Sequence, residues 1–406
     1  MKRRTLVAAA AGAALSAAAF QVPAFAQDKP IRIGVPTAVQ LQVGRDTQAA
    51  IEMAIEDINA KGGVLGRKLE MVVADETELP ETGINAIKKL TAEDKADVLI
   101  GGYTSGVTLA QLPHISRAKT IYLGVGAASP AITQRVKKDY DDYKYIFRVG
   151  PINAAHQARQ LTNFLSEFVG GQLGYKKVAI VGENAKWVQD LVPILKKGAG
   201  EAGVDVTFTE LFDTKTSDFS PLFSKVRDSG AQFLTVILSH ASSDVFAKQW
   251  HDSRFPMPYG GVDVKSMDGD FCSRIDGKSI SEIAGNFAVK APITSKTVPF
   301  FDAFTKRTQR QPVYTAYFAN DAVHLYAQAV AKAGSTDPDK VIAALEQTSY
   351  EGIAGLIEFD EMHDVKAGGK HPNLLFAQWR DQCKREVVFP PQVRTADPIL
   401  PPWLKK

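Results

Sequence analysis

The chain has 406 residues, of which 45% are hydrophobic and 23% are charged. This composition is typical of a globular protein and excludes a disordered, collagenous or disulfide-rich one, and the length predicts about two to three domains. Lys2, Arg3 and Arg4 supply the formal charge of +3, so the rest of the chain is balanced. A balanced chain lacks the basic face that a nucleic-acid partner requires, and we expect no such partner.

Residues 1–26 have the pattern of a secretory signal peptide. The basic start is followed by an Ala-rich apolar run over residues 6–20 and by the small-x-small sequence Ala24-Phe25-Ala26. A membrane anchor is disfavoured, because the run is shorter than the ~20 apolar residues of a spanning helix. The Arg pair fits the general and the twin-arginine export routes alike. We therefore expect an exported, periplasmic protein that is cleaved after Ala26.

Strands and helices are predicted to alternate through the next 120 residues. Continuously apolar strands are expected at residues 31–35, 69–74, 98–100 and 121–125, with helices ending near residue 59 and spanning 84–91. Continuous apolar strands that alternate with helices indicate βαβ units and a parallel sheet buried on both faces.

A second alternating series follows Pro151. Helices are predicted at residues 156–169, 188–202, 221–227 and 243–253, and strands at 178–181, 204–208 and 233–238. The tail differs, with helices at 298–308, 317–333 and 337–347 and then two strands at 374–380 and 386–389 around a turn at Asp381-Gln382. The fold class predicted is α/β, with two doubly wound parallel-sheet lobes.

Cys272 and Cys383 are the only cysteines. In an oxidising compartment they could form a disulfide, but two separated cysteines are no framework and could equally be unrelated thiols. The sequence has no CxxC, HxxxH or HExxH pattern, so no zinc or other metal site is expected. A GxGxxG-like stretch at Gly124–Ser129 follows a fourth predicted strand rather than a first one, so no dinucleotide cofactor is expected either.

Three loops, at residues 101–106, 124–130 and 260–263, follow predicted strands at the edge where parallel sheets bind ligands. In the first, Thr104 and Ser105 open a helix, where hydroxyl and N–H groups suit a carboxylate or simply cap the helix. In another, Asp263 could pair with an ammonium group or serve as a turn acid. His240 follows the strand at 233–238 and could face a cleft. Ser105 is not in a GxSxG elbow and no nucleophile–base pair is visible, so we expect no enzyme.

Four stretches of the chain carry a resemblance to a known family. They are IRIGV at residues 31–35, AIEDINAKGGVLGRKLE at 54–70, VLIGG at 98–102 and YIFRV at 145–149. The chain resembles type I periplasmic substrate-binding proteins of the branched-chain amino acid (leucine/isoleucine/valine) class, which feed ABC transporters. The resemblance implies two lobes joined by three crossovers, with residues 27–149 and 289–367 in lobe 1 and residues 150–288 and 368–406 in lobe 2.

The resemblance also implies ligand contacts from lobe 1. Ser105, with Thr104 beside it, falls where the family holds a ligand carboxylate. Ala127 falls where a backbone carbonyl takes the ligand ammonium. Ala128 departs from the family, because amino-acid binders usually have Thr there. Tyr103 is a further candidate for the pocket lining, as is Tyr317.

From lobe 2, the resemblance implies Trp187, His240 and an acid. Trp187 falls where an aromatic residue, usually Tyr followed by Gly, lines the pocket, and Val188 replaces that Gly. His240 lies close to the position of a family aromatic residue. Val262 or Asp263 falls where an acid meets the ammonium, with the alignment uncertain by one or two residues.

The resemblance implies a passive binding protein that closes on a small carboxylate-bearing ligand and presents it to an ABC permease. An amino acid of the branched-chain type is favoured. An aromatic or aliphatic acid without an amine is the alternative, because Ala128 lacks a hydroxyl and aromatic candidates surround the site. An exported ligand sensor of the same fold is a further alternative. A monomer is expected.

Overall fold

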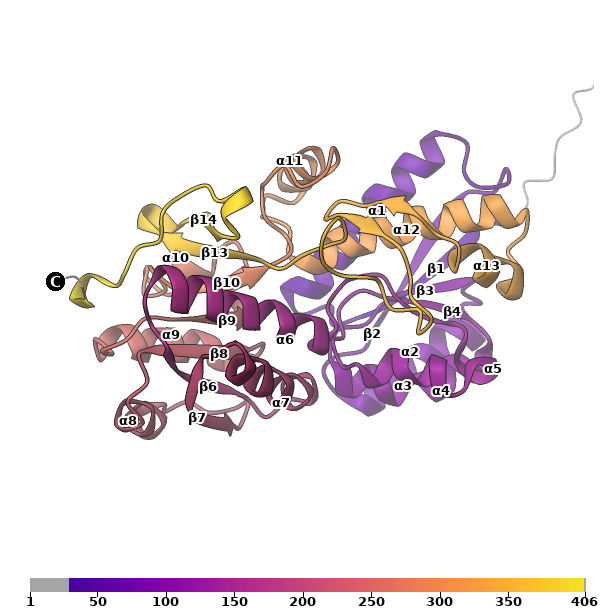
Figure 1. Ribbon diagram of the computed structural model, residues 1–406. Coiled ribbons are helices and arrows are strands. Elements are labelled where there is room, and N and C mark those ends of the chain that lie inside the picture. The colour runs from indigo at the N-terminus through magenta and orange to yellow at the C-terminus, as the bar shows by residue number, and fades with distance from the viewer. Residues whose placement is uncertain (1–28, 405–406) are drawn as a thin grey trace, which may run out of the picture.

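The computed structural model describes residues 29–404, so the predicted signal peptide lies outside the described residues. Two sheets form the centres of two lobes that lie side by side (Figure 1). We call the lobe built on the five-stranded sheet lobe 1 and the lobe built on the seven-stranded sheet lobe 2. None of the helices in this range is both long and apolar enough to cross a membrane.

The sheet of lobe 1 is fully parallel in the order β2-β1-β3-β4-β5. Its strands are β1 (Ile31–Thr37), β2 (Leu69–Asp75), β3 (Val98–Gly101), β4 (Ile121–Gly124) and β5 (Ile146–Arg148). One face packs against α1 (Gln42–Ala60) and α12 (Tyr314–Ala333), and the other against α2 (Pro80–Lys88), α3 (Ser105–Ala118) and α4 (Ala131–Lys138). Burial on both faces explains why these strands are continuously apolar.

The sheet of lobe 2 has the order β14-β13-β10-β9-β8-β6-β7. Five strands are parallel, namely β6 (Lys177–Glu183), β7 (Asp205–Phe212), β8 (Phe233–Leu238), β9 (Tyr259–Asp263) and β10 (Ile283–Asn286). The last two, β13 (Leu375–Arg380) and β14 (Lys384–Phe389), form the expected hairpin and add to β10 in antiparallel orientation. The alternating helices are α6 (Ala154–Asn163), α7 (Lys186–Glu201), α8 (Ser220–Asp228), α9 (Ser242–Asp252) and α10 (Phe271–Arg274).

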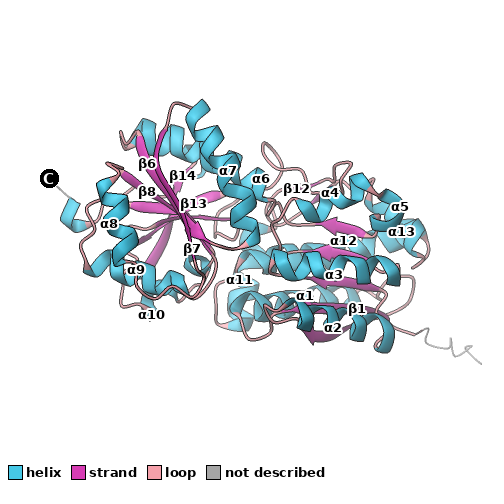
Figure 2. Ribbon diagram, turned by 90° about the horizontal axis from the view of Figure 1, so that it is seen from below, coloured by secondary structure: helices cyan, strands magenta, loops and turns pink. Residues whose placement is uncertain are grey.

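The chain returns to lobe 1 after β10. There it forms α11 (Thr297–Thr308), α12, α13 (Pro338–Leu345) and a small sheet of β11 (Tyr350–Glu351) and β12 (Leu356–Ile357). The short helix α5 (Tyr140–Tyr143), from earlier in the chain, lies near α13. It then crosses back to lobe 2 for the terminal hairpin, which explains the helices and strands of the tail (Figure 2). The α/β fold class inferred from the sequence is confirmed.

A buried ion pair joins the segments that lead into two of the crossovers. Asp364, ahead of the last crossover, accepts hydrogen bonds from Arg148 (2.9 Å), Asn153 (2.6 Å) and Thr133 (2.9 Å). Arg148 and Asp364 are almost fully buried. Because a lone buried charge is costly, the two residues stabilise each other and fix the end of β5 to the segment that leads into the last crossover.

Several predicted element bounds were wrong by a few residues. The helix predicted at residues 156–169 begins at Ala154 and continues past Asn163 as wider π-helical turns to Gln172. The strand predicted at residues 204–208 extends to Phe212. Cys272 and Cys383 form a disulfide, with their Cα atoms 5.5 Å apart, between α10 and the turn that joins β13 to β14. The pairing left open by the sequence is thereby resolved.

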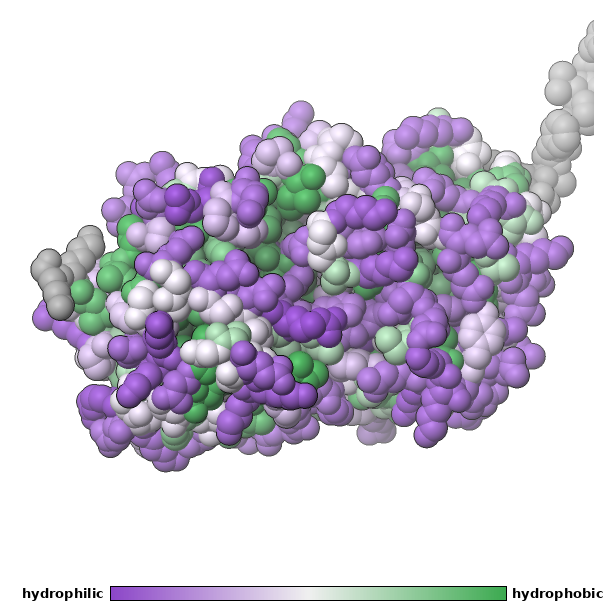
Figure 3. Space-filling model, viewed as in Figure 1, coloured by the Kyte–Doolittle hydropathy of each residue, from purple (hydrophilic) through white to green (hydrophobic). Residues whose placement is uncertain are grey.

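The outer surface shows no dominant apolar face on the side drawn in Figure 3. Hydrophilic residues cover most of that face, and hydrophobic residues appear mainly as separate spots and in the recess between the lobes. Apolar residues scattered singly are normal on the surface of a folded protein.

Candidate ligand-binding site

A cavity of about 230 Å³ lies between the two lobes. Loops that follow β3 and β4 form its lobe 1 wall, and the loops after β8 and β9 form its lobe 2 wall together with the start of α7. These are the carboxyl ends of parallel strands, the usual ligand-binding edge of such sheets. Pockets for drug-sized ligands span roughly 300–1,000 Å³, so this cavity suits a smaller solute.

The lobe 1 wall presents the first turn of α3. The chain reaches this turn through Gly102, which has φ +83°, and a Cβ atom there would lie 1.9 Å from the hydroxyl oxygen of Tyr122. Only glycine fits both constraints. The Ser105 Oγ accepts hydrogen bonds from the N–H groups of Ala128 (3.1 Å) and Ser129 (3.0 Å). Its own proton is therefore free to donate toward the cavity.

Thr104 adds a second hydroxyl beside Ser105. Its Oγ1 is buried and has no hydrogen-bond partner among the described residues. The first N–H groups of a helix also lack partners inside the helix and favour negative charge. Unused hydroxyls and helix N–H groups thus meet on one wall, an arrangement that suits a carboxylate.

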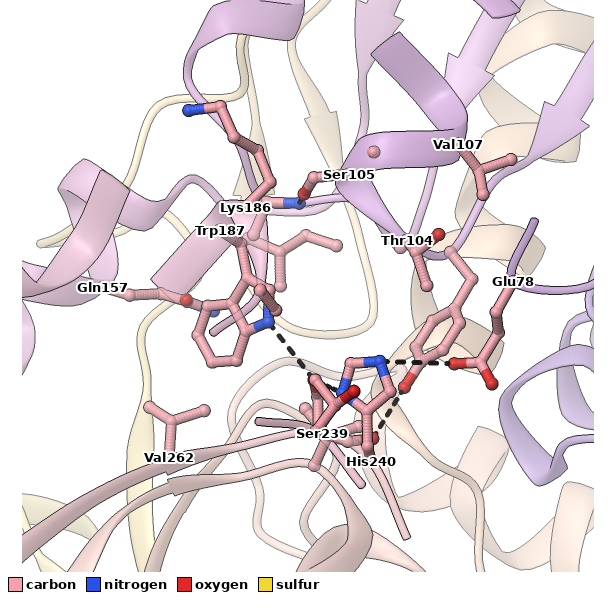
Figure 4. A pocket seen from close by; sticks show the side chains of 18 of the residues that line it. Glu78, Thr104, Ser105, Val107, Gln157, Lys186, Trp187, Ser239, His240 and Val262 are labelled. Atoms are coloured by element: carbon pink, nitrogen blue, oxygen red, sulfur yellow. Dashed lines mark hydrogen bonds and ion pairs between the residues drawn. The ribbon is translucent and has the colours of Figure 1, made fainter. Parts of the chain in front are cut away.

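Two aromatic side chains from opposite lobes meet at Ser239, after β8. The hydroxyl of Tyr103 donates to the Ser239 carbonyl (3.1 Å), and the indole N–H of Trp187 donates to the Ser239 Oγ (3.3 Å). Burial raises the pKa of Tyr103 well above its ordinary value, so the phenol stays neutral and remains a donor. Figure 4 shows Trp187 with its bond to Ser239 in the wall of the cavity.

Glu183, at the end of β6, is the charged centre of the lobe 2 wall. Its fully buried carboxylate accepts from the N–H of Ser239 (2.8 Å), the N–H of His240 (2.9 Å), the Nδ1 of His240 (2.7 Å) and the hydroxyl of Ser242 (2.7 Å). Burial acts to raise the pKa of Glu183, but these bonds and the charge of His240 outweigh it and lower the pKa below its usual value. This carboxylate is fully occupied by protein donors.

Polar contacts also bridge the two lobes near the cavity. The Nε2 of His240 lies 3.8 Å from the carboxylate of Glu78, in lobe 1. The hydroxyl of Ser129, in lobe 1, donates to Asp190 of α7 (2.6 Å). With the Tyr103–Ser239 bond, these contacts hold the lobes against each other.

Most of the residues expected at the site line this cavity, namely Tyr103, Thr104, Ser105, Ala128, Trp187 and His240. Their contact with a ligand remains a prediction. The structure does not place Ala127, Asp263 or Tyr317 among the lining residues.

Asp263 is turned away from the cavity because side chains alternate along a strand. Val262 faces the cavity instead, and Asp263 accepts from the Ser243 hydroxyl and from the N–H groups of Lys265 (2.9 Å) and Ser266 (3.2 Å). Burial raises the pKa of Asp263 to about 6. It is a buried cap of the following turn.

Ala127 and Tyr317 are displaced by near neighbours. The side chain of Ala127 packs in the apolar cluster under α3 and α4, while Gly126 lines the cavity. The hydroxyl of Tyr317 donates to the Val289 carbonyl (3.1 Å) in the core, while Tyr314, one helical turn earlier, lines the cavity.

The sequence reasoning missed several polar residues of the site, among them Glu78, Gln157 and Glu183. Glu78 and Gln157 line the cavity, and Glu183 lies directly behind its wall. No motif surrounds any of them. The one available signal was the position of Glu183 at the carboxyl end of an apolar strand, where ligand-site residues gather.

Comparison with known proteins supplies the family. The model of the family described as "Periplasmic binding protein" matches residues 30–384. A leucine-, isoleucine-, valine-, threonine- and alanine-binding protein of Pseudomonas aeruginosa is 26% identical over 377 residues, which cover 90% of this chain and 95% of that protein. A Leu/Ile/Val-binding protein homolog 1 of Brucella abortus is 25% identical over 374 residues, with the same coverage.

Solved structures share the fold. A putative branched-chain amino acid ABC transporter protein from Silicibacter pomeroyi gives a TM-score of 0.80 at 22% identity, covering 92% of this chain and 100% of that one. A solute-binding protein from R. palustris in complex with benzoate gives 0.76 at 17% identity, covering 92% and 99%. The resemblance drawn from the sequence is confirmed. The chain belongs to the periplasmic binding protein family.

Proposed function

We propose that this protein captures a small carboxylate-bearing solute in the cavity between its lobes and delivers it to an ABC permease. The observation that carries the proposal is the lobe 1 wall, where Ser105 and Thr104 offer unused hydroxyls beside the first turn of α3. A carboxylate bound there would accept from the hydroxyls and from free N–H groups together. Family membership supports a role in binding and transport rather than in catalysis.

An amino acid, with a branched-chain side chain favoured, is the leading ligand class. Relatives named for leucine, isoleucine and valine binding support it. The cavity also has apolar walls at Ile152, Val262 and Phe287 that suit an aliphatic side chain. The Gly126 carbonyl accepts from Tyr314 (3.2 Å) and keeps a second lone pair, so it and Glu78 are the candidate acceptors for the ammonium group.

A carboxylic acid without an amine is the second candidate, and it is favoured because the acids of the lobe 2 wall are already bound to protein groups. Asp263, the acid expected to meet an ammonium, is bound to its own turn, and Glu183 is fully used by protein donors. Ala128 supplies no hydroxyl. Solved structures of the same fold bind 3,4-dihydroxybenzoic acid and benzoate, which lack an amine.

We also infer export and the division of the chain. Residues 1–26 have the signal-peptide pattern, and family members are periplasmic, which supports a mature periplasmic chain that begins at Gln27. Lobe 1 is assigned residues 27–149 and 289–367, and lobe 2 residues 150–288 and 368–406. All strands of the five-stranded sheet come from the residues assigned to lobe 1, and all strands of the seven-stranded sheet come from those assigned to lobe 2, which supports this division. We propose that the protein acts as a monomer.

Thermal unfolding of residues 27–406 tests the proposal. The protein is refolded first, to remove carried-over solute, and is then heated with leucine, isoleucine, valine, benzoate or 2-oxoisocaproate. A ligand at 1,000 times its dissociation constant stabilises the fold by about 4 kcal/mol, which raises the melting temperature measurably. A shift with amino acids alone supports the first class, and a shift with amine-free acids alone supports the second. A chain that responds to no carboxylate contradicts the proposal.

A further inference from the structure

Gln157, on α6, has an unpaired amide in the wall of the cavity. The residue is 3% exposed, and its Oε1 is buried without a hydrogen-bond partner among residues 29–404. No hydrogen bond of its Nε2 to these residues is found either, and the side chain lines the cavity. Buried polar groups are almost always paired, so an unpaired amide at this place indicates a partner that enters the cavity.

The backbone that carries Gln157 is firmly held. Gln157 lies in the first turn of α6, and its N–H donates to the carbonyl of Asn153 (2.9 Å). The side chain of Asn153 caps the helix by accepting from Ala155 (2.8 Å) and also donates to Asp364, ahead of the last crossover (2.6 Å). The amide is thus presented from a fixed helix end, as a recognition group should be.

Ser239 and Glu183, two other polar residues of lobe 2 at the cavity, are already used by protein groups, which distinguishes Gln157 from them. Ser239 binds Tyr103, Trp187 and Glu183, and Glu183 binds His240 and Ser242. In Figure 4, Gln157 lies on the side of Trp187 away from His240 and Glu78. The cavity therefore offers the donors of α3 and the candidate acceptors Gly126 and Glu78 from lobe 1, and from lobe 2 the Gln157 amide, which both donates and accepts.

We propose that Gln157 binds an uncharged hydroxyl or carboxamide group of the solute, at a point separate from its carboxylate. This inference rests on the proposed function and narrows it to carboxylic acids that carry a second, neutral polar group. A neutral amide pairs well with a group that donates and accepts, because its Oε1 and Nε2 then both find partners. A purely apolar solute would displace water from the amide and leave it unpaired, which costs affinity.

Matched ligand pairs test this inference by isothermal titration calorimetry. The pairs are valine with threonine, leucine with asparagine, and benzoate with 3- and 4-hydroxybenzoate, so the members of each pair are similar in shape and differ in a hydroxyl or amide. The expected result is a tenfold or greater preference for the polar member in at least one pair. Sites built to bind a polar group reject the analogue that lacks it.

The variant Gln157→Met removes the amide and keeps the length of the side chain. We expect it to reduce the preference to twofold or less and to leave the affinity for the apolar member unchanged or higher. Since the amide has no protein partner, the unfolding temperature of the ligand-free variant should not fall. Gln160→Met is the matched control on the same helix, because the amide of Gln160 binds Asn373 (3.3 Å) and Leu374 (3.3 Å). That change should lower stability and keep the preference.

Three results would overturn the inference. A wild-type protein that binds the apolar member of every pair at least as tightly contradicts it while leaving the proposed function intact. A Gln157→Met variant that keeps the preference, or that unfolds at a clearly lower temperature, shows that the amide serves the fold. Failure of both members of every pair to bind removes the proposed carboxylate site, and the inference falls with it.

Discussion

The two walls of the cavity use their polar groups in opposite ways. On the lobe 1 wall, Ser105 and Thr104 keep donors that no group among residues 29–404 uses. On the lobe 2 wall, Glu183 is surrounded by donors from Ser239, His240 and Ser242. An acid near a cavity is therefore no evidence for an ammonium site until its lone pairs are counted. Here the free groups indicate where a solute binds, and the satisfied groups indicate what keeps the wall rigid.

Replacing Glu183 should produce the largest effect on stability. In Glu183→Gln the new amide N–H₂ would face donors that now meet a carboxylate, and His240 would lose its counter-charge. We expect the free energy of unfolding to fall by about 3 kcal/mol, as for other broken buried pairs. Urea unfolding at pH 7 measures the change.

The matched control for this change is Glu201→Gln, since Glu201 forms an exposed pair with Lys197 at 3.8 Å. Its effect should stay within about 0.5 kcal/mol. Because the pKa of Glu183 is lowered in the folded protein, its contribution should be present above the ordinary carboxyl pKa and should disappear as the pH falls through the lowered value. An equal effect of both variants would contradict the assigned role of the lobe 2 wall.

Ser105→Ala should cause the largest loss of binding. The change removes a donor to the solute carboxylate, and bonds to charged groups contribute about 1.5–3 kcal/mol, so the affinity should fall by roughly 10- to 150-fold. Two N–H groups that now donate to Ser105 also lose their acceptor, which lowers stability. Titration calorimetry with the tightest carboxylate from the melting screen measures the affinity. Ser224→Ala, on α8, is the control, and an unchanged affinity for Ser105→Ala would contradict a carboxylate at this wall.

Ser129→Ala should have a smaller effect that acts through lobe closure. The hydroxyl of Ser129 bonds to Asp190 across the cleft (2.6 Å), while its N–H bonds to Ser105 (3.0 Å). Loss of the hydroxyl removes about 1 kcal/mol from the closed form. The affinity should fall about fivefold, chiefly through faster dissociation in stopped-flow measurements. Asp190→Ala should give the same change, and the double variant should add little to either one.

The pH dependence of binding should be the smallest effect. Burial and, to a smaller extent, the positive charge of Lys265 act to lower the pKa of His240. The hydrogen bond to Glu183 and the negative charges of Glu183 and Glu78 outweigh them and raise this pKa above its ordinary value. The contact with Glu78 crosses the cleft, so protonated His240 favours the closed form. That contribution is present while His240 is protonated and is lost as the pH rises through the raised pKa. Affinity should fall less than fivefold across this range, and Glu78→Gln should flatten the curve.

The sequence predicted the sheets well because burial on both faces leaves a local signal. Residues 98–101 and 121–124 are wholly apolar or glycine, and each forms a parallel strand near the predicted place. Element ends were predicted less well, since the π-helical turns after Asn163 have no pattern of their own. The Cys272–Cys383 bond joins residues 111 positions apart, a distance that no local pattern encodes.

Two signals in the sequence predicted the site: the ends of the predicted strands and the positions implied by the family resemblance. Both signals placed Ser105 on the cavity, and family position alone placed Trp187 there. They could not distinguish Val262 from Asp263, because a shift of one residue along a strand moves a side chain to the other face. They also missed Gln157, whose importance lies in the absence of a partner. That property belongs to the assembled structure and not to any stretch of sequence.

The disulfide has a consequence for how the protein can be produced. A link between residues 111 positions apart restricts the unfolded chain, and for a loop of that size the chain-entropy model gives about 4–5 kcal/mol. The linked turn lies in the terminal hairpin, which reaches its sheet only after the chain has passed through the other lobe. Protein made in a reducing cytosol would lack this disulfide. The backbone amides of β13 and β14, at the edge of the lobe 2 sheet, should then exchange their hydrogens faster. Material made in an oxidising compartment is the appropriate reference for every affinity above.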